Sequence, residues 1–137
     1  MNYISPEKCF EYVLEAEWHH DQEFLYYCKG LVYKELCNYK DAIRLLEKAL
    51  SFSQEIEADE ILNNIGECLM KQNLLGCAMN KFEEALNLNP FSNQVLANLI
   101  ILDKLVSETE FNEKTKVEEF LNRTFKEHRG EKLIDSY

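Results

Sequence analysis

The chain has 137 residues, which is the size of one domain, and 46% of them are hydrophobic, which is enough for a packed core. Its four Gly and two Pro are too few for a turn-rich β architecture. The net charge of −10 excludes nucleic acid as a partner, because nucleic-acid affinity comes mainly from neutralised phosphates, and it favours basic protein segments instead.

The N-terminal residues and the cysteines indicate a cytoplasmic protein. Glu7 and Lys8 stand where a secretory signal would need an apolar run, so we expect no signal peptide. No apolar run is long enough to cross a bilayer, so we expect no direct membrane insertion. The five cysteines are odd in number and none forms a CxxC pair, which indicates reduced thiols.

The first predicted helix spans residues 5–20. Ser5 is a suitable N-cap, Pro6 suits the first helical position, and Phe10 and Leu14 share one face. We interpret this helix as a cap on the repeats that follow or as a degenerate second helix of an earlier pair.

Two similar helix pairs follow, offset by 36 residues. The segments "DAIRLLEKAL" and "CAMNKFEEAL" align at this offset, and both have apolar residues three or four apart, as an amphipathic helix requires. Gly30 aligns with Gly66, where we expect two helices to cross closely, and Leu46 aligns with Phe82, which should fill the space between neighbouring helices. Small residues recur at further expected crossings: Ala42, Ala49, Ala78 and Ala85.

The predicted repeats span residues 23–56 and 59–92, and a looser third pair spans 93–128. The helices of the third pair are "FSNQVLANLIILDKLV" and "KTKVEEFLNRTFKEH", with a loop between them. We expect Gly130 to end the last helix and to leave residues 129–137 as a short tail.

This spacing resembles that of the tetratricopeptide repeat. The residues that carry the resemblance stand in the order expected for that family: Gly66, Leu69, Ala78, Phe82, Ala85 and Pro90. The resemblance implies an all-α fold, a right-handed superhelix of about seven helices in antiparallel pairs, within one domain over residues 1–137. It also implies a scaffold for protein–protein interaction and not an enzyme.

The C-terminal half is also similar to the coatomer epsilon subunit, at "ANLIIL" and "EHRGEKLIDSY". A second resemblance, at "LNNIGECL" and "VLANLIILDKL", is to the tetratricopeptide subunit of the TRAPP tethering complex. The epsilon resemblance implies a reduced vesicle-coat subunit that holds the alpha coat subunit. Such a subunit would be cytoplasmic and peripheral on vesicle or Golgi membranes through its complex. The alternative is a generic tetratricopeptide adaptor or co-chaperone with an unrelated partner.

The resemblance implies that the first helix of each pair lines a concave groove. The predicted groove residues are Phe24, Tyr27, Leu31, Asn63, Glu67, Met70, Ala97, Ile101 and Lys104. The apolar members of this set favour an amphipathic partner helix with basic edges. The alternatives are that the 5–20 helix covers the groove or that a second copy of the chain does, which leaves self-association open.

No catalytic site, cofactor or metal site is expected. His19 and His20 point about 100° apart on a helix, and only weak carboxylate ligands lie one turn away. Cys28 lies on an apolar-flanked helix and suits a buried structural role. A carboxylate clamp of the co-chaperone kind would have Lys and Asn at the positions of Tyr27 and Leu31.

Overall fold

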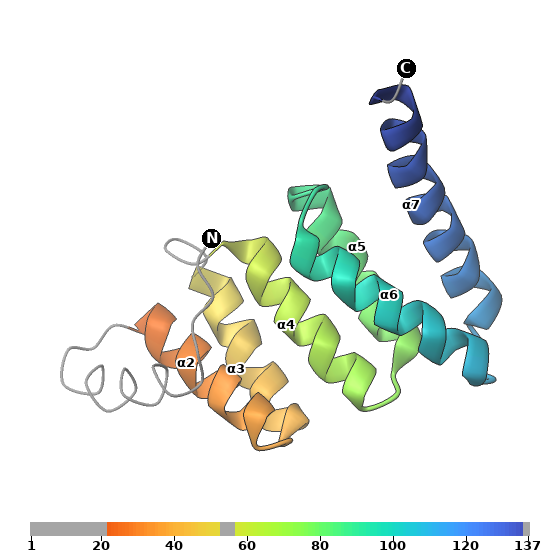
Figure 1. The fold of residues 1–137 in the computed structure, drawn as a ribbon. Helices are drawn as coiled ribbons and strands as arrows, with labels where there is room; N and C mark the ends of the chain where they lie inside the picture. Colours follow the sequence, from red (N-terminus) through yellow and green to blue (C-terminus); the bar gives the residue numbers. More distant parts are fainter. Residues whose placement is uncertain (1–21, 53–56, 136–137) are drawn as a thin grey trace.

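The structure is a computed structural model that describes residues 22–52 and 57–135, and every regular element in these ranges is an α-helix. The helices are α2 (Gln22–Glu35), α3 (Tyr39–Phe52), α4 (Ala58–Lys71), α5 (Leu75–Leu88), α6 (Asn93–Glu108) and α7 (Lys114–Asp135). They pack in consecutive antiparallel pairs, as Figure 1 shows. The predicted all-α fold is therefore confirmed, and it is consistent with a tetratricopeptide superhelix.

The 36-residue period of the sequence is also the period of the backbone. α4 and α5 begin and end 36 residues after α2 and α3, whereas α6 begins 35 residues after α4. α7 continues through Gly130 to Asp135, so the expected helix end at Gly130 is wrong. A glycine inside a helix costs only about 1 kcal/mol relative to alanine, which weakens a helix without ending it. The helix predicted over residues 5–20 lies outside the described residues.

The turns inside the first two pairs are built in the same way. Cys37 and Asn73 have a left-handed backbone, with φ of 60° and 63°. After α2, the N–H of Cys37 donates to the carbonyl of Lys34, and the N–H of Asn38 donates to the carbonyl of Tyr33. The corresponding two bonds recur after α4. This is the Schellman motif, which satisfies carbonyl groups at a helix end and turns the chain back on itself.

Asn73→Ala should destabilise the protein by about 1 kcal/mol, because a left-handed backbone disfavours alanine by roughly that much and asparagine by less. Asn73→Gly should cause no such loss, because glycine adopts this backbone freely. Urea denaturation of the two variants and the parent measures the difference. Equal stability of the alanine and glycine variants would contradict a left-handed turn at this position.

The helices of a pair approach each other at the aligned glycines. A Cβ atom on Gly30 would lie 2.8 Å from Cγ of Leu46, and a Cβ atom on Gly66 would lie 2.6 Å from Cε1 of Phe82. Both distances are shorter than van der Waals contact, so only glycine fits without movement. Leu46, Phe82 and the four aligned alanines are completely buried. The predicted helix crossings at these positions are therefore confirmed.

Gly66→Ala should destabilise the protein by about 1–3 kcal/mol, because its methyl group would overpack against the buried ring of Phe82. Gly76→Ala is a matched control. Its Cβ would meet the carboxylate of exposed Glu113, which can move away, and alanine favours the helix. Thermal unfolding of both variants measures the effect, and an equal loss in both would contradict a close helix approach at Gly66.

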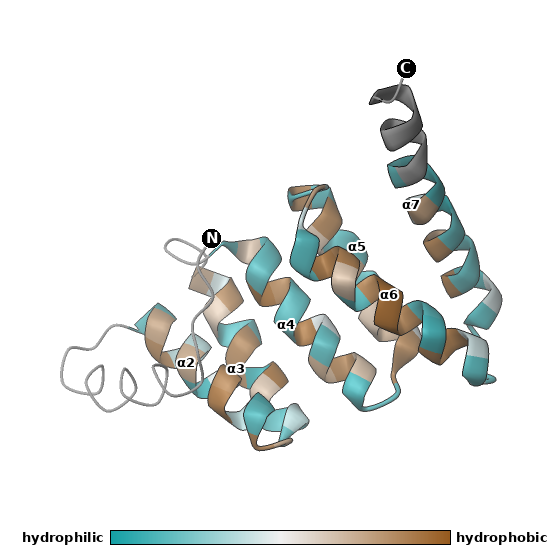
Figure 2. Ribbon diagram, viewed as in Figure 1, coloured by the Kyte–Doolittle hydropathy of each residue, from teal (hydrophilic) through white to brown (hydrophobic). Residues whose placement is uncertain are grey.

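α4 lies in the middle of the core and packs on two sides. Ile61 and Ile65 belong to the cluster that α4 forms with α2 and α3, whereas Leu62 and Met70 belong to the cluster with α5, α6 and α7. Figure 2 shows hydrophobic and hydrophilic residues alternating along α4, in contrast to the largely hydrophobic middle of α6. A third side of α4 carries polar residues, and these define the candidate site.

Candidate binding groove

One side of α2, α4 and α6 forms a groove with a volume of about 230 Å³. Most of its lining residues recur three or four positions apart, which places them on one face of their helix. They are Tyr27, Leu31, Lys34 and Glu35 from α2, Glu60, Asn63, Asn64 and Glu67 from α4, and Gln94 and Asn98 from α6. The lining therefore comes from the first helix of each pair.

Four of the predicted residues line this groove: Tyr27, Leu31, Asn63 and Glu67. Tyr27 and Leu31 are 1% and 6% exposed, so they form the floor, and Asn63 is also buried. Glu67 is half-buried and carries charge at the edge. Their role as contacts for a partner stays a prediction.

Two predicted residues on α2 and α4 lie outside the groove lining. Met70 is 3% exposed and packs in the core cluster with Phe82, so it is a core residue and not a groove residue. Phe24 is half-buried against the core of the first pair. Leu31 also packs in that core, and it is the one described lining residue without a polar group, whereas an amphipathic partner helix was expected to meet several apolar side chains.

The predicted residues on α6, Ala97, Ile101 and Lys104, are exposed and also lie outside the lining. Each stands 34 positions after its predicted counterpart on α4, whereas α6 begins 35 residues after α4. An error of one residue rotates a side chain by about 100° around the helix. The groove position belongs to Asn98, which lies 35 residues after Asn63. Its signal in the sequence is one polar residue within the apolar stretch "VLANLIIL".

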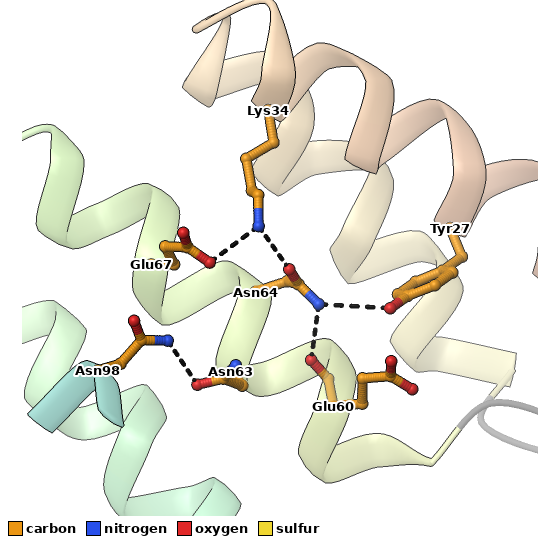
Figure 3. A network of polar contacts seen from close by, with 7 residues as sticks. All are labelled: Tyr27, Lys34, Glu60, Asn63, Asn64, Glu67 and Asn98. Carbon is orange, nitrogen blue, oxygen red and sulfur yellow. Dashed lines mark hydrogen bonds and ion pairs between the residues drawn. The ribbon is translucent and has the colours of Figure 1, made fainter. Parts of the chain in front are cut away.

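A network of polar contacts joins α2 to α4 (Figure 3). The Nζ atom of Lys34 lies 2.8 Å from Oε2 of Glu67 and 2.8 Å from Oδ1 of Asn64. The amide nitrogen of Asn64 donates to the hydroxyl of Tyr27 at 3.3 Å and to the backbone carbonyl of Glu60 at 3.0 Å. These bonds satisfy buried groups and fix their orientation, so this part of the groove is organised without a ligand.

A second link joins α4 to α6. The amide nitrogen of Asn98 donates to Oδ1 of Asn63 at 2.9 Å, and both side chains are at least nine-tenths buried. The Nδ2 atom of Asn63 and the Oδ1 atom of Asn98 form no hydrogen bond with the other residues that the structure describes. With respect to the described residues, the NH2 group of Asn63 and the carbonyl oxygen of Asn98 therefore remain able to donate and accept hydrogen bonds.

Glu60 differs from the other buried polar residues of the groove. It is 5% exposed, and its Oε2 atom has no hydrogen-bond partner within the described ranges. Burial raises the pKa of the Glu60 carboxyl, a hydrogen bond with Tyr27 lowers it, and the nearby charges of Asp59 and Glu57 raise it further. In the described ranges no cation contacts the Oε2 atom, and an unpaired buried carboxylate is unfavourable, so its charge reduces the stability of the folded chain at neutral pH.

Glu60→Gln should therefore stabilise the free protein by about 1 kcal/mol at neutral pH, because an amide is less costly to bury than a carboxylate. Since the folded-state pKa is raised, the contribution of Glu60 to stability is most favourable below its ordinary value of 4.5 and is lost as pH rises through the raised pKa. The stabilisation by Glu60→Gln should therefore shrink as the pH falls toward 4.5. Urea unfolding across the pH range measures it, and a loss of stability at neutral pH would contradict the unpaired carboxylate.

The side chains of the groove are suited to binding a ligand through hydrogen bonds and charge. Within residues 22–52 and 57–135, no three His, Cys, Asp or Glu side chains are arranged to hold a metal ion. Burial raises the pKa of Cys68 to about 12, so this thiol stays protonated at neutral pH and is a poor nucleophile. The amides and charges in the groove can donate and accept hydrogen bonds and attract an opposite charge.

Residues 23–55 match the family model of the tetratricopeptide repeat, within the first predicted repeat. Tetratricopeptide domains are generic modules for protein–protein interaction and are usually non-catalytic. No curated protein and no solved structure matches the chain, and nothing supports the resemblance to the coatomer epsilon subunit or to the TRAPP complex. None of the helices in the described ranges combines the length and the apolar character needed to cross a bilayer.

Proposed function

We propose that the protein is an interaction module that binds a segment of a partner protein in the groove of α2, α4 and α6. The observation that carries this proposal is a group of polar side chains that are buried and yet line a groove: Glu60, Asn63, Asn64 and Asn98. Core packing alone would favour apolar residues at such positions. Polar groups held in fixed orientations at a concave surface are suited to recognise a ligand.

The geometry favours an extended segment over a helix. The amide nitrogen of Asn63 and the amide oxygen of Asn98, which bond no other described residue, match the C=O and N–H groups of an extended peptide, whereas a helix uses these groups internally. The groove of about 230 Å³ is smaller than the roughly 300–1,000 Å³ of typical ligand pockets. It therefore suits one or two side chains and not the face of a helix about 10 Å across. The proposed partner is an extended segment in place of an amphipathic helix.

The resemblance of the C-terminal half to the coatomer epsilon subunit adds a finer possibility. A reduced epsilon-like subunit would bind the alpha coat subunit and act in the cytoplasm on vesicle or Golgi membranes. This stays a prediction. Purification of the protein with its partners and mass spectrometry would test it, and the absence of alpha coat subunit would leave the generic adaptor as the proposal.

Gln94→Arg should weaken the binding of groove-directed peptides by about tenfold or more. Gln94 is exposed and lines the groove, so an arginine there would occupy the peptide site without disturbing the core. The measurement is the affinity of peptides selected from a random display library on the full chain. Asn80→Arg also replaces a side-chain amide with arginine, on an exposed residue of α5, and should leave affinity unchanged. Peptides that bind both variants equally would place the binding surface elsewhere.

A further inference from the structure

The charges that line the groove are unequal. Glu35, Glu60 and Glu67 are acidic, and Lys34 is the one basic residue among the described lining residues. Lys34 is already held by Glu67 and Asn64, each at 2.8 Å. The acidic excess therefore remains on Glu60 and Glu35, and the groove would attract a cation.

Of the two acidic residues that remain, Glu60 carries the negative charge that destabilises the folded chain more. Glu35 is exposed, so water can solvate its charge. Glu60 is buried in the groove wall, and its Oε2 atom lacks a partner among residues 22–52 and 57–135. The terminal torsion of a glutamate side chain is soft, so a small rotation can present this oxygen to the groove. A cation that reached it would replace missing hydration with a charge-assisted hydrogen bond.

We propose that the groove receives the cationic side chain of a lysine or arginine from the partner segment, with its N–H group donating to Oε2 of Glu60. The inference rests on the proposed function, because it assigns the residue class that the bound segment presents. Asn63 and Asn98 lie next to this position and would hold the peptide backbone beside the cation. One buried ion pair would then give the module its specificity. The two asparagines would hold the bound peptide in place.

The contacts of Lys34 explain why this lysine does not pair with Glu60. Lys34 lies on α2 and contacts α4 at Glu67, which is about two helical turns from Glu60. Its ammonium group is committed to two acceptors, so movement toward Glu60 would break both contacts. The network thus pairs the carboxylate of Glu67 and leaves the Oε2 atom of Glu60 available to a ligand.

Four peptide libraries test the proposal on the full chain. The central residue is fixed as lysine, arginine, norleucine or glutamate, and the flanking positions are random mixtures of uncharged residues. The lysine or the arginine library should bind about tenfold more tightly than the norleucine library, which lacks the charge, and the glutamate library most weakly. The lysine and arginine arms identify which cation fits better. Fluorescence polarisation measures each affinity.

Glu60→Gln should remove the preference for a cation and leave the affinity for the norleucine library unchanged. Glu84→Gln makes the same substitution on an exposed residue of α5 and should preserve the preference. If Glu60→Gln still prefers the lysine or arginine library over the norleucine library, the preference comes from the general acidic surface and the proposal is overturned. Circular dichroism accompanies each measurement, and a Glu60→Gln chain without helices would show a structural role for the carboxylate and overturn it as well.

The same data separate this inference from the proposed function. Equal binding of the lysine, arginine and norleucine libraries, with loss of all three in Gln94→Arg, would overturn the cation receptor and support the groove. Binding that Gln94→Arg does not affect would overturn both. A preference that emerges only after Lys8→Met would assign the cation to the chain's own N-terminal segment and overturn a role for the partner.

Discussion

The close approach of two helices at a glycine is the constraint on which the rest of the structure depends. At Gly30 the facing residue is Leu46, and at Gly66 it is Phe82, and in each case a methyl group would not fit. This contact fixes the first helix of a pair against the second. Because it recurs after 36 residues, it gives α2 and α4 the same orientation relative to their partners, and the same face of each helix turns toward the groove.

A groove formed in this way brings together residues that lie far apart in the sequence, and the polar contacts then make it specific. Lys34 bonds Asn64 and Glu67 between α2 and α4, and one hydrogen bond joins Asn98 to Asn63 between α6 and α4. These links make adjacent pairs depend on each other, as expected for stacked repeats. The Oε2 atom of Glu60 is a fully buried carboxylate oxygen that this internal network leaves without a hydrogen-bond partner in the described ranges.

Much of the fold could be predicted from the sequence, because Gly30, Gly66, Leu46 and Phe82 act locally and repeat with a clear period. The candidate site could be predicted only in part. The groove position on α6 depends on the one-residue difference between a spacing of 34 and one of 35, which hydrophobic periodicity alone does not resolve. The sequence also did not reveal that Met70 is a core residue, because its burial depends on contacts with α5 and the helices beyond it.

The central claim is that α4 and α6 meet in a fixed register that pairs Asn63 with Asn98. A double-mutant cycle on urea unfolding, with Asn63→Ala, Asn98→Ala and the double variant, measures the coupling between the two side chains directly. The hydrogen bond between them predicts a coupling free energy of about 1 kcal/mol. Additive effects of the two substitutions, which correspond to a coupling free energy near zero, would contradict the register and the groove built on it.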